Sequence, residues 1–211
     1  MSQIWLASYP RSGNTFLRTI LNSCFGFKSG SIYPNDMAGN KALEAYVGHL
    51  EHSDRSIRFP PGQPPLIKTH ELDKNKNIKT IYTVRNGLDS VKSIYAFYNQ
   101  QISLERISRG EFRFGTWANH VQSWAPWDRG NTLFLRYEDL TDEEKRDDLL
   151  EQMAKFLGAE IKTRTIPPRD KIASSDGRFV RSLEAKRTEL TEEQKQIFYE
   201  HNGKMMEFLG Y

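Results

Sequence analysis

Apolar side chains along this chain fall into two patterns, short continuous runs and longer stripes with helical spacing. The short runs predict buried strands at residues 4–8, 66–70, 79–84 and 132–137. The stripes predict helices at residues 16–24, 41–50 and 88–101. A strand, a turn and a helix follow one another twice, which predicts an α/β fold of three layers, with a mostly parallel central sheet flanked by helices.

Two further helices are predicted near the end of the chain from capping boxes, in which Thr is followed three positions later by Glu or Gln. One box, from Thr141 to Glu144, opens a predicted helix that ends at Gly158. The other begins at Thr191 and opens a final helix that continues through Phe208.

The segments between these elements are polar or aromatic. Residues 163–187 are basic and poor in apolar side chains, so we expect an extended or mobile loop there. Residues 51–65 are polar and end in a proline-rich run, which is typical either of a lid over a ligand or of a plain surface connection. Between residues 101 and 130, the helical spacing of Trp117, Val121 and Trp124 favours packing in the core.

The turn after the first predicted strand reads Tyr-Pro-Arg-Ser-Gly-Asn-Thr-Phe at positions 9–16 and leads directly into the first helix. Backbone N–H groups at a helix start lack partners and point the same way, so this turn predicts an anion site. The alternative is an ordinary strand-to-helix turn with Ser12 or Asn14 as the N-cap. The turn is not a standard nucleoside-triphosphate loop, because Ser8 replaces its first glycine and Asn14 replaces its lysine.

Composition limits the classes of protein to consider. With 211 residues and 37% hydrophobic content, the chain is expected to form a single domain over residues 1–211. A formal net charge of +3 is mild and gives no reason to expect nucleic acid as a partner. Cys24 is the only cysteine, so no disulfide within the chain is expected. Without an apolar run near the ~20 residues of a membrane span, and with a strand already at residue 4, we expect a soluble cytoplasmic protein.

Side chains that can bind an anion or transfer a proton stand at or just after the end of each predicted strand. Arg11 follows the first, Lys68 and His70 end the second, Arg85 follows the third and Tyr137 ends the fourth. Ligands of parallel sheets bind at the carboxyl ends of the strands, so these side chains are expected at one edge of the sheet. The remaining histidines occupy no recognisable motif and are expected to be structural: His49, His52, His120 and His201. Aromatic side chains near this edge that suggest a flat or apolar acceptor are Tyr33, Phe97, Tyr98, Trp124 and Trp127, although core packing explains most of them equally well.

Four of these segments resemble motifs of the sulfotransferases that use 3′-phosphoadenosine-5′-phosphosulfate (PAPS). The turn at positions 9–16 resembles the loop that binds the 5′-phosphosulfate in that family. Arg85, followed eight positions later by Ser93, is similar to its 3′-phosphate site. Lys68-Thr-His70 resembles the segment with the family's catalytic base, and the Tyr-Glu-Asp that begins at Tyr137 resembles the segment near its adenine.

The resemblance implies a P-loop-NTPase-like sulfotransferase fold and transfer of a sulfuryl group from PAPS to a hydroxyl of a small-molecule alcohol or phenol, without a metal. The product of the donor would be 3′-phosphoadenosine 5′-phosphate (PAP). It implies that His70 is the base, that Arg11 stabilises the leaving group and that Lys68 helps to hold the transferring group. The residues implied to bind the cofactor are Arg11, Ser12, Gly13, Asn14, Thr15, Phe16, Arg85, Ser93, Tyr137 and Arg181.

The sequence also departs from the family pattern. Arg11 stands where the family usually has lysine, and Phe16 stands where it usually has a tryptophan that can stack on the adenine. Of the C-terminal segment that closes over the 3′-phosphate, only Arg181 is kept. Two alternatives are therefore considered, a P-loop-related small-molecule kinase that would need Mg²⁺, and a catalytically silent protein that binds PAPS or PAP.

Overall fold

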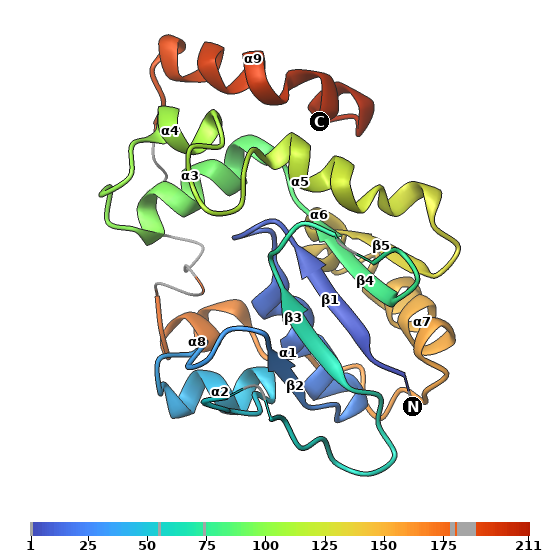
Figure 1. The fold of residues 1–211 in the computed structure, drawn as a ribbon. Coiled ribbons are helices and arrows are strands. Elements are labelled where there is room, and N and C mark those ends of the chain that lie inside the picture. Colours follow the sequence, from blue (N-terminus) through green and yellow to red (C-terminus); the bar gives the residue numbers. More distant parts are fainter. Residues whose placement is uncertain (1, 55, 74, 178–179, 181–188) are drawn as a thin grey trace.

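The central sheet of this protein has five strands that are all parallel. The computed structural model describes residues 2–54, 56–73, 75–177, 180 and 189–211. The strands run in the spatial order β2-β3-β1-β4-β5, with β1 in the middle (Figure 1). Their bounds are Ile4–Ser8 for β1, Ser29–Ser31 for β2, Leu66–Thr69 for β3, Lys79–Val84 for β4 and Thr132–Arg136 for β5. The mostly parallel sheet predicted from the alternation of elements is thus confirmed.

Helices cover both faces of the sheet. The two longer helices on one face are α1 (Asn14–Phe25) and α7 (Arg146–Leu157). The opposite face is covered by α3 (Gly87–Phe97), α5 (Trp117–Trp124) and α9 (Glu192–Phe208). The remaining elements are α2 (Lys41–Val47), α4 (Leu104–Ser108), η1 (Pro126–Asp128), α6 (Tyr137–Thr141) and α8 (Arg169–Ala173). Figure 1 shows α9 furthest from the sheet, beyond α3, α4 and α5, and α2 beside α8 at the β2 edge.

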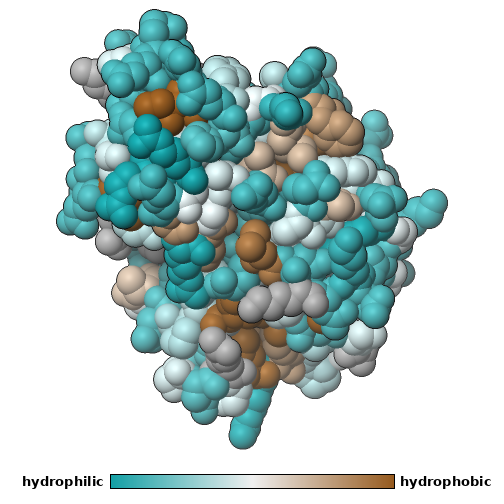
Figure 2. All heavy atoms as spheres, turned by 45° about the horizontal axis from the view of Figure 1, so that its top comes forward, coloured by the Kyte–Doolittle hydropathy of each residue, from teal (hydrophilic) through white to brown (hydrophobic). Residues whose placement is uncertain are grey.

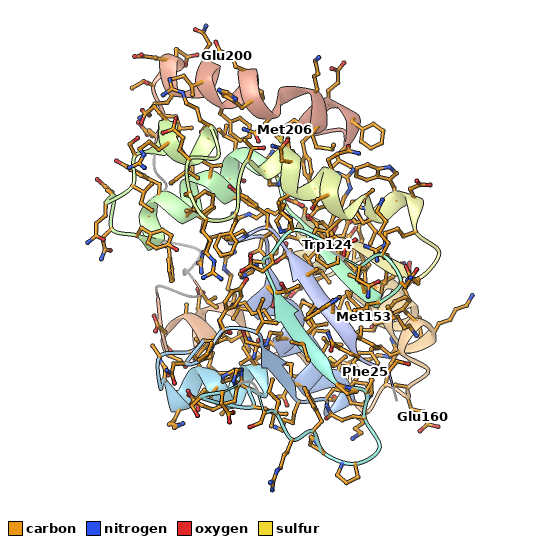
Figure 3. All side chains as sticks on the ribbon, viewed as in Figure 1. Phe25, Trp124, Met153, Glu160, Glu200 and Met206 are labelled. Atoms are coloured by element: carbon orange, nitrogen blue, oxygen red, sulfur yellow. The ribbon has the colours of Figure 1, made fainter. Side chains whose placement is uncertain are left out.

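The core forms on both faces of the sheet because side chains alternate along each strand. Leu6 of β1 joins the core under α1 and α7, whereas its neighbour Ala7 joins the core under α3, α5 and α9. In Figure 3, Phe25 and Met153 lie in the first of these cores and Trp124 and Met206 in the second. The predicted burial of Trp117, Val121 and Trp124 is confirmed.

The edge strand β2 carries no apolar signal, and the sequence pattern did not predict it. Its residues are Ser29, Gly30 and Ser31, all buried, and they pair with β3. A Cβ at Gly30 would come within 2.5 Å of the end of the Ile57 side chain, so a larger residue there would require Ile57 to move. The strand is defined by its pairing with β3 and not by an apolar pattern of its own.

Several predicted helix bounds and one predicted loop differ from the structure, and the helix predicted at residues 41–50 ends at Val47. The Thr141 capping box is wrong, because Thr141 ends α6 and its Oγ1 bonds backward to the carbonyls of Tyr137 and Glu138. The helix expected there begins only at Arg146, although it does end before Gly158 in the left-handed conformation. The loop expected at residues 163–187 contains α8. The predicted helix at residues 88–101 ends at Phe97.

The capping box at the last helix is confirmed. Thr191 Oγ1 accepts from the Gln194 amide at 3.2 Å, and the Gln194 side chain accepts from the Thr191 amide at 3.2 Å. Within the described residues, none of the helices has the length and apolar content needed to cross a membrane. Hydrophilic side chains dominate the face shown in Figure 2, with apolar side chains gathered in patches between them.

Candidate active site

One cleft of about 830 Å³ lies at the carboxyl edge of the sheet and collects most of the predicted site residues. The predicted residues that line it are Arg11, Gly13, Asn14, Thr15, Phe16, Lys68, His70, Arg85, Ser93 and Tyr137. Of the aromatic residues expected near an acceptor, Tyr33, Phe97 and Tyr98 also line it. The side chains come from separate segments of the chain, and they meet because parallel strands end at the same edge.

Two predicted cofactor-binding residues are not placed in the cleft. The Ser12 side chain is fully buried, and its Oγ lies 3.1 Å from Ser90 Oγ of α3. Ser12 therefore ties the turn to α3, and its hydroxyl does not face the cleft. Arg181 lies outside the described residues, although the neighbouring Val180 lines the cleft.

Trp124 and Trp127 do not face an acceptor in the cleft, and the alternative of packing against the protein itself holds for them. Trp124 is buried in the core, where its indole N–H donates to the Glu71 carbonyl at 3.0 Å. Trp127 packs instead against Phe208 at the end of α9, with ring centroids 4.7 Å apart. Neither side chain lines the cleft.

The turn between β1 and α1 presents backbone amides to the cleft. Gly13 is the N-cap of α1 with φ 96°, and no side chain caps the helix, so the alternative of a Ser or Asn N-cap is wrong. A Cβ at Gly13 would come within 2.4 Å of Tyr137 Cδ2, so only glycine allows that ring to pack on the turn. Asn14 donates instead to the Leu6 carbonyl at 2.9 Å and anchors the helix start to β1. The uncapped start of α1 is thus suited to an anion.

Two arginines lie close together beside this turn. Arg11 Nε donates to Ser93 Oγ at 3.1 Å, and its guanidinium lies 5.0 Å from the centre of the Phe97 ring. Arg85 donates to the Arg11 carbonyl at 3.2 Å and lies 4.8 Å from the centre of the Tyr137 ring. Ser93 therefore contacts Arg11, whereas the resemblance paired it with Arg85. The region concentrates positive charge and hydrogen-bond donors, as an anionic ligand requires.

His70 follows β3 and has a defined tautomer. Its Nδ1 lies 2.7 Å from the Ser8 carbonyl, which can only accept, so Nδ1 carries the proton and Nε2 is left as an acceptor. The ring stacks on Tyr33, with centroids 5.9 Å apart, and meets the edge of Phe114 at 5.9 Å. Burial, together with the charge of Lys68, lowers the pKa of His70 well below its ordinary value of 6.5. His70 is therefore neutral near pH 7 and able to accept a proton.

His120, which the sequence placed in no motif, supports His70 from below. Its Nε2 donates to the His70 carbonyl at 3.0 Å, and its Nδ1 accepts from the Tyr82 hydroxyl at 2.9 Å. The side chain is fully buried, and burial lowers its pKa to about 3. The expected structural role of this histidine agrees with its contacts, but its position beneath His70 has no signal in the sequence.

The cleft beyond His70 is lined by aromatic side chains and one cation. Tyr33 accepts from the His70 amide at 2.9 Å and donates to Glu71 at 3.2 Å. The Arg113 guanidinium lies 5.2 Å from the ring centres of both Tyr33 and Phe114 and donates to Glu71 at 2.7 Å. An acceptor molecule beside His70 would therefore meet flat apolar surfaces with one guanidinium at their edge.

Lys68 is held by a carboxylate that sequence reasoning missed. Lys68 Nζ lies 2.6 Å from Asp36, whose other oxygen lies 3.0 Å from Arg18. Asp36 stands in an irregular loop, and Arg18 lies off the apolar stripe of the first helix, so neither had a motif that could have indicated this role. Among the described residues, no cluster of His, Cys, Asp and Glu is suited to hold a metal ion.

Comparisons with known proteins agree with this geometry. The family described as sulfotransferase domain matches residues 1–196. The chain is 28% identical over 191 residues to sulfotransferase 1A1 of Mus musculus, an alignment that covers 77% of this chain and 62% of that protein. It is 32% identical over 176 residues to sulfotransferase 1B1 of Canis lupus familiaris, covering 73% of this chain and 58% of that protein. The chain thus spans about three fifths of the length of these curated relatives.

Solved structures share the fold. Mouse sulfotransferase SULT7A1 complexed with PAP superposes with a TM-score of 0.60 at 18% identity, covering 97% of this chain and 84% of that one. Retinol dehydratase in complex with androsterone and PAP superposes with a TM-score of 0.64 at 19% identity, covering 97% of this chain and 80% of that one. The sulfotransferase fold expected from the four motifs is confirmed, and the chain belongs to the sulfotransferase-domain family.

Proposed function

We propose that this protein transfers a sulfuryl group from PAPS to a hydroxyl of a small-molecule alcohol or phenol. The observation that carries the proposal is the position of His70, whose unprotonated Nε2 belongs to the same cleft as the start of α1 and two arginines. A base beside an anion site is what such a transfer requires. Family membership and the PAP named with two neighbours of the same fold support this choice of donor.

The residues present fit a nucleotide with two separate anionic groups. The amides at the start of α1 and the Arg11 guanidinium would hold the 5′ end, and Arg85 would hold the 3′-phosphate. Ser93 would join Arg85 there by exchanging its bond from Arg11 for one to the phosphate. Tyr137 packs on the turn at Gly13, and both its ring and that of Phe16 line the cleft, so either could stack on an adenine. When bound, the donor supplies the sulfuryl group and departs as PAP.

The side chains of the cleft divide the remaining chemistry between them. His70 Nε2 accepts the proton of the acceptor hydroxyl, while its Nδ1–H bond to the Ser8 carbonyl keeps the ring in place. Lys68 and Arg11 stabilise negative charge that develops on the transferring and leaving oxygens. Tyr33 and Phe114 keep water away from the face of the base and hold the acceptor ring.

The kinase alternative needs an acidic side chain in the cleft to hold Mg²⁺. The carboxylate nearest to that role by sequence, Asp139, pairs with Lys145 at 2.6 Å and does not line the cleft. Asp36 does line the cleft, but both of its oxygens already bind cations, Lys68 and Arg18. The sulfuryl-transfer proposal is therefore preferred, and turnover of ATP that depends on magnesium would reverse the preference.

Nucleotide binding can be tested by thermal unfolding with PAP. Binding to the folded state alone adds about 2.7 kcal/mol when PAP is present at about 100 times its Kd, so the melting temperature should rise. Arg85→Ala should remove most of that rise because it removes a cation from the phosphate site. Arg58→Ala is the matched control, since Arg58 is exposed and lies outside the cleft. No rise in the wild-type protein at millimolar PAP would exclude the proposed donor.

Catalysis can be tested separately with His70→Ala and a panel of phenols and alcohols. Loss of a general base lowers turnover by about 10²–10⁴-fold, while the PAP-dependent rise in melting temperature should persist. Because the pKa of His70 is lowered, the acid limb of the wild-type pH profile should lie below pH 6.5. His201→Ala, at an exposed histidine, is the control. Binding of PAPS without sulfation of any acceptor would instead support the silent binding protein.

A further inference from the structure

Lys68 belongs to a buried group of three charges that reaches from the cleft into the protein. One Asp36 oxygen lies 2.6 Å from Lys68 Nζ, and the other lies 3.0 Å from a terminal nitrogen of Arg18. The side chains are 9%, 7% and 0% exposed for Lys68, Asp36 and Arg18. A carboxylate shared in this way cannot turn toward either cation without releasing the other.

Arg18 is itself fixed by residues far from the cleft. Its Nε donates to Ser29 Oγ at 2.8 Å, and one terminal nitrogen lies 3.4 Å from the Ser29 carbonyl. The same nitrogen donates at 2.8 Å to His49 Nδ1, which must accept because a guanidinium has no acceptor. All three guanidinium nitrogens are thus engaged, and Arg18 holds Asp36 from the side of β2 and the end of α2.

Only two of the three charged side chains line the cleft. Asp36 and Lys68 line the cleft, and Arg18 does not. Two cations share one carboxylate, so the group keeps a net positive charge, and Lys68 is the cation that presents it to a ligand. A simple pair of Lys68 with Asp36 would be neutral overall and would attract an anion less strongly.

We propose that Asp36 and Arg18 are positioning residues. Asp36 holds the Lys68 ammonium beside His70 and keeps it charged, and Arg18 fixes Asp36 in that place. This inference rests on the proposed function, in which Lys68 acts as a cation on the transferring group. Asp36 fixes the position of the Lys68 ammonium and supplies the negative charge that stabilises it. Arg18 keeps Asp36 ionised and oriented, and its own positive charge limits how strongly Lys68 is held.

The charges around Lys68 determine the sign of the expected effects. Burial lowers the pKa of Lys68, Asp36 raises it, and Arg18 and Arg11 lower it further. The other groups that interact with the ammonium are the Tyr33 ring, His49 and His70. Loss of the Asp36 charge should therefore lower the pKa of Lys68, whereas loss of the Arg18 charge should raise it. If Asp36 and Arg18 only maintained the fold, their removal would not shift the pKa of Lys68 in opposite directions.

The test compares Asp36→Asn with Arg18→Gln. In Asp36→Asn, the alkaline limb of the kcat profile should move to lower pH by about 1 unit or more, because a buried lysine without its carboxylate loses its proton more easily. In Arg18→Gln, the same limb should move to higher pH. Lys68→Met should remove the limb, which assigns it. NMR titration of the Lys68 side chain, assigned by its loss in Lys68→Met, gives the same shifts without relying on turnover.

Control variants distinguish a shift in the Lys68 titration from a general loss of stability and from failure of the proposed sulfuryl transfer. Asp73→Asn breaks the buried pair of Arg129 with Asp73, 3.1 Å apart and outside the cleft, so it should lower stability without moving either the limb or the Lys68 titration. If Asp36→Asn does not fold, the upward shift in Arg18→Gln decides alone. Equal titration of Lys68 in the wild type and in Arg18→Gln would overturn the inference. Absence of sulfuryl transfer with shifted Lys68 titrations would instead overturn only the proposed function.

Discussion

Gly13 shows how one residue makes the anion site possible. Its φ of 96° lies where side chains with a Cβ are strained, and the Tyr137 ring occupies the space that a Cβ would need. Two requirements thus meet at one position, a left-handed turn and the close approach of an aromatic ring. The first can be suspected from a Ser-Gly-Asn turn, whereas the second depends on where α6 begins.

We expect Gly13→Ala to lower the free energy of unfolding by more than Gly39→Ala does. Gly39 has φ 73° with no atom within 4 Å of the added Cβ, so its variant bears only the backbone strain of about 1–2 kcal/mol. Gly13→Ala adds a clash at 2.4 Å with Tyr137 Cδ2. Urea unfolding measures both, and combining Gly13→Ala with Tyr137→Ala should recover part of the loss. Equal losses in the two alanine variants would contradict the steric account.

At the scale of elements, α9 ties the helical layer over β4 together. Asn202 of α9 donates to the Ser108 carbonyl at the end of α4 at 3.1 Å and accepts from the Ala118 amide of α5 at 3.0 Å. Its side chain is 1% exposed. One amide therefore satisfies backbone groups of two other helices, and this joins α9 to α4 and α5.

We expect Asn202→Ala to destabilise the protein more than Thr191→Ala. An unsatisfied buried backbone group costs about 1–3 kcal/mol, and Asn202→Ala leaves the Ser108 carbonyl and the Ala118 amide without this partner. Thr191→Ala removes only the N-cap of α9, at about 1 kcal/mol. The comparison is made by urea unfolding. A larger loss in Thr191→Ala would show that the cap, and not the buried amide, holds α9 in place.

At the scale of the whole molecule, several histidines stay neutral in the folded protein. Burial lowers the pKa of His120 to about 3 and, together with the Arg18 charge, that of His49 to about 4. The pKa of His70 is also lowered. In the unfolded state these histidines have a pKa of about 6.5 and bind protons more readily than in the folded state. Acid pH therefore stabilises the unfolded state relative to the folded one.

We expect the free energy of unfolding to decrease as the pH falls below about 6.5, because below that value these histidines bind protons in the unfolded state but stay neutral in the folded state. Asp36 contributes only at lower pH, since Lys68 and Arg18 outweigh the effect of burial and hold its pKa well below the ordinary value. Urea unfolding at about pH 7 and about pH 5 measures the loss. His120→Gln should be less stable than the wild type at pH 7 but should lose less on acidification. An unchanged slope would exclude His120 as a source.

Some predictions at this scale stay predictions. Organisation of residues 1–211 as one domain and a cytoplasmic location are expected from composition and pattern. The role of Arg181 at the 3′-phosphate also stays a prediction, because it lies outside the described residues.

Several elements could be predicted because their determinants are local. The apolar runs of β1, β3, β4 and β5 mark strands, and the Thr191 capping box marks the start of α9. β2 could not be predicted, because its small polar residues become a strand only by pairing with β3. The Thr141 box failed because the chain already forms α6 there, so the threonine ends one helix and does not open the next.

In the cleft, too, some features follow from the sequence and others only from tertiary contacts. The order of motifs and the parallel sheet together determine that the turn at Gly13, Lys68, His70 and Arg85 share one edge, since each follows a strand that ends there. Only the tertiary structure decided that Ser12 turns inward to Ser90, that His120 bonds the carbonyl of His70, and that Asp36 joins Lys68 to Arg18. Local spacing carries no information on these contacts, because they join segments distant in the chain whose polar groups must find partners once burial removes water.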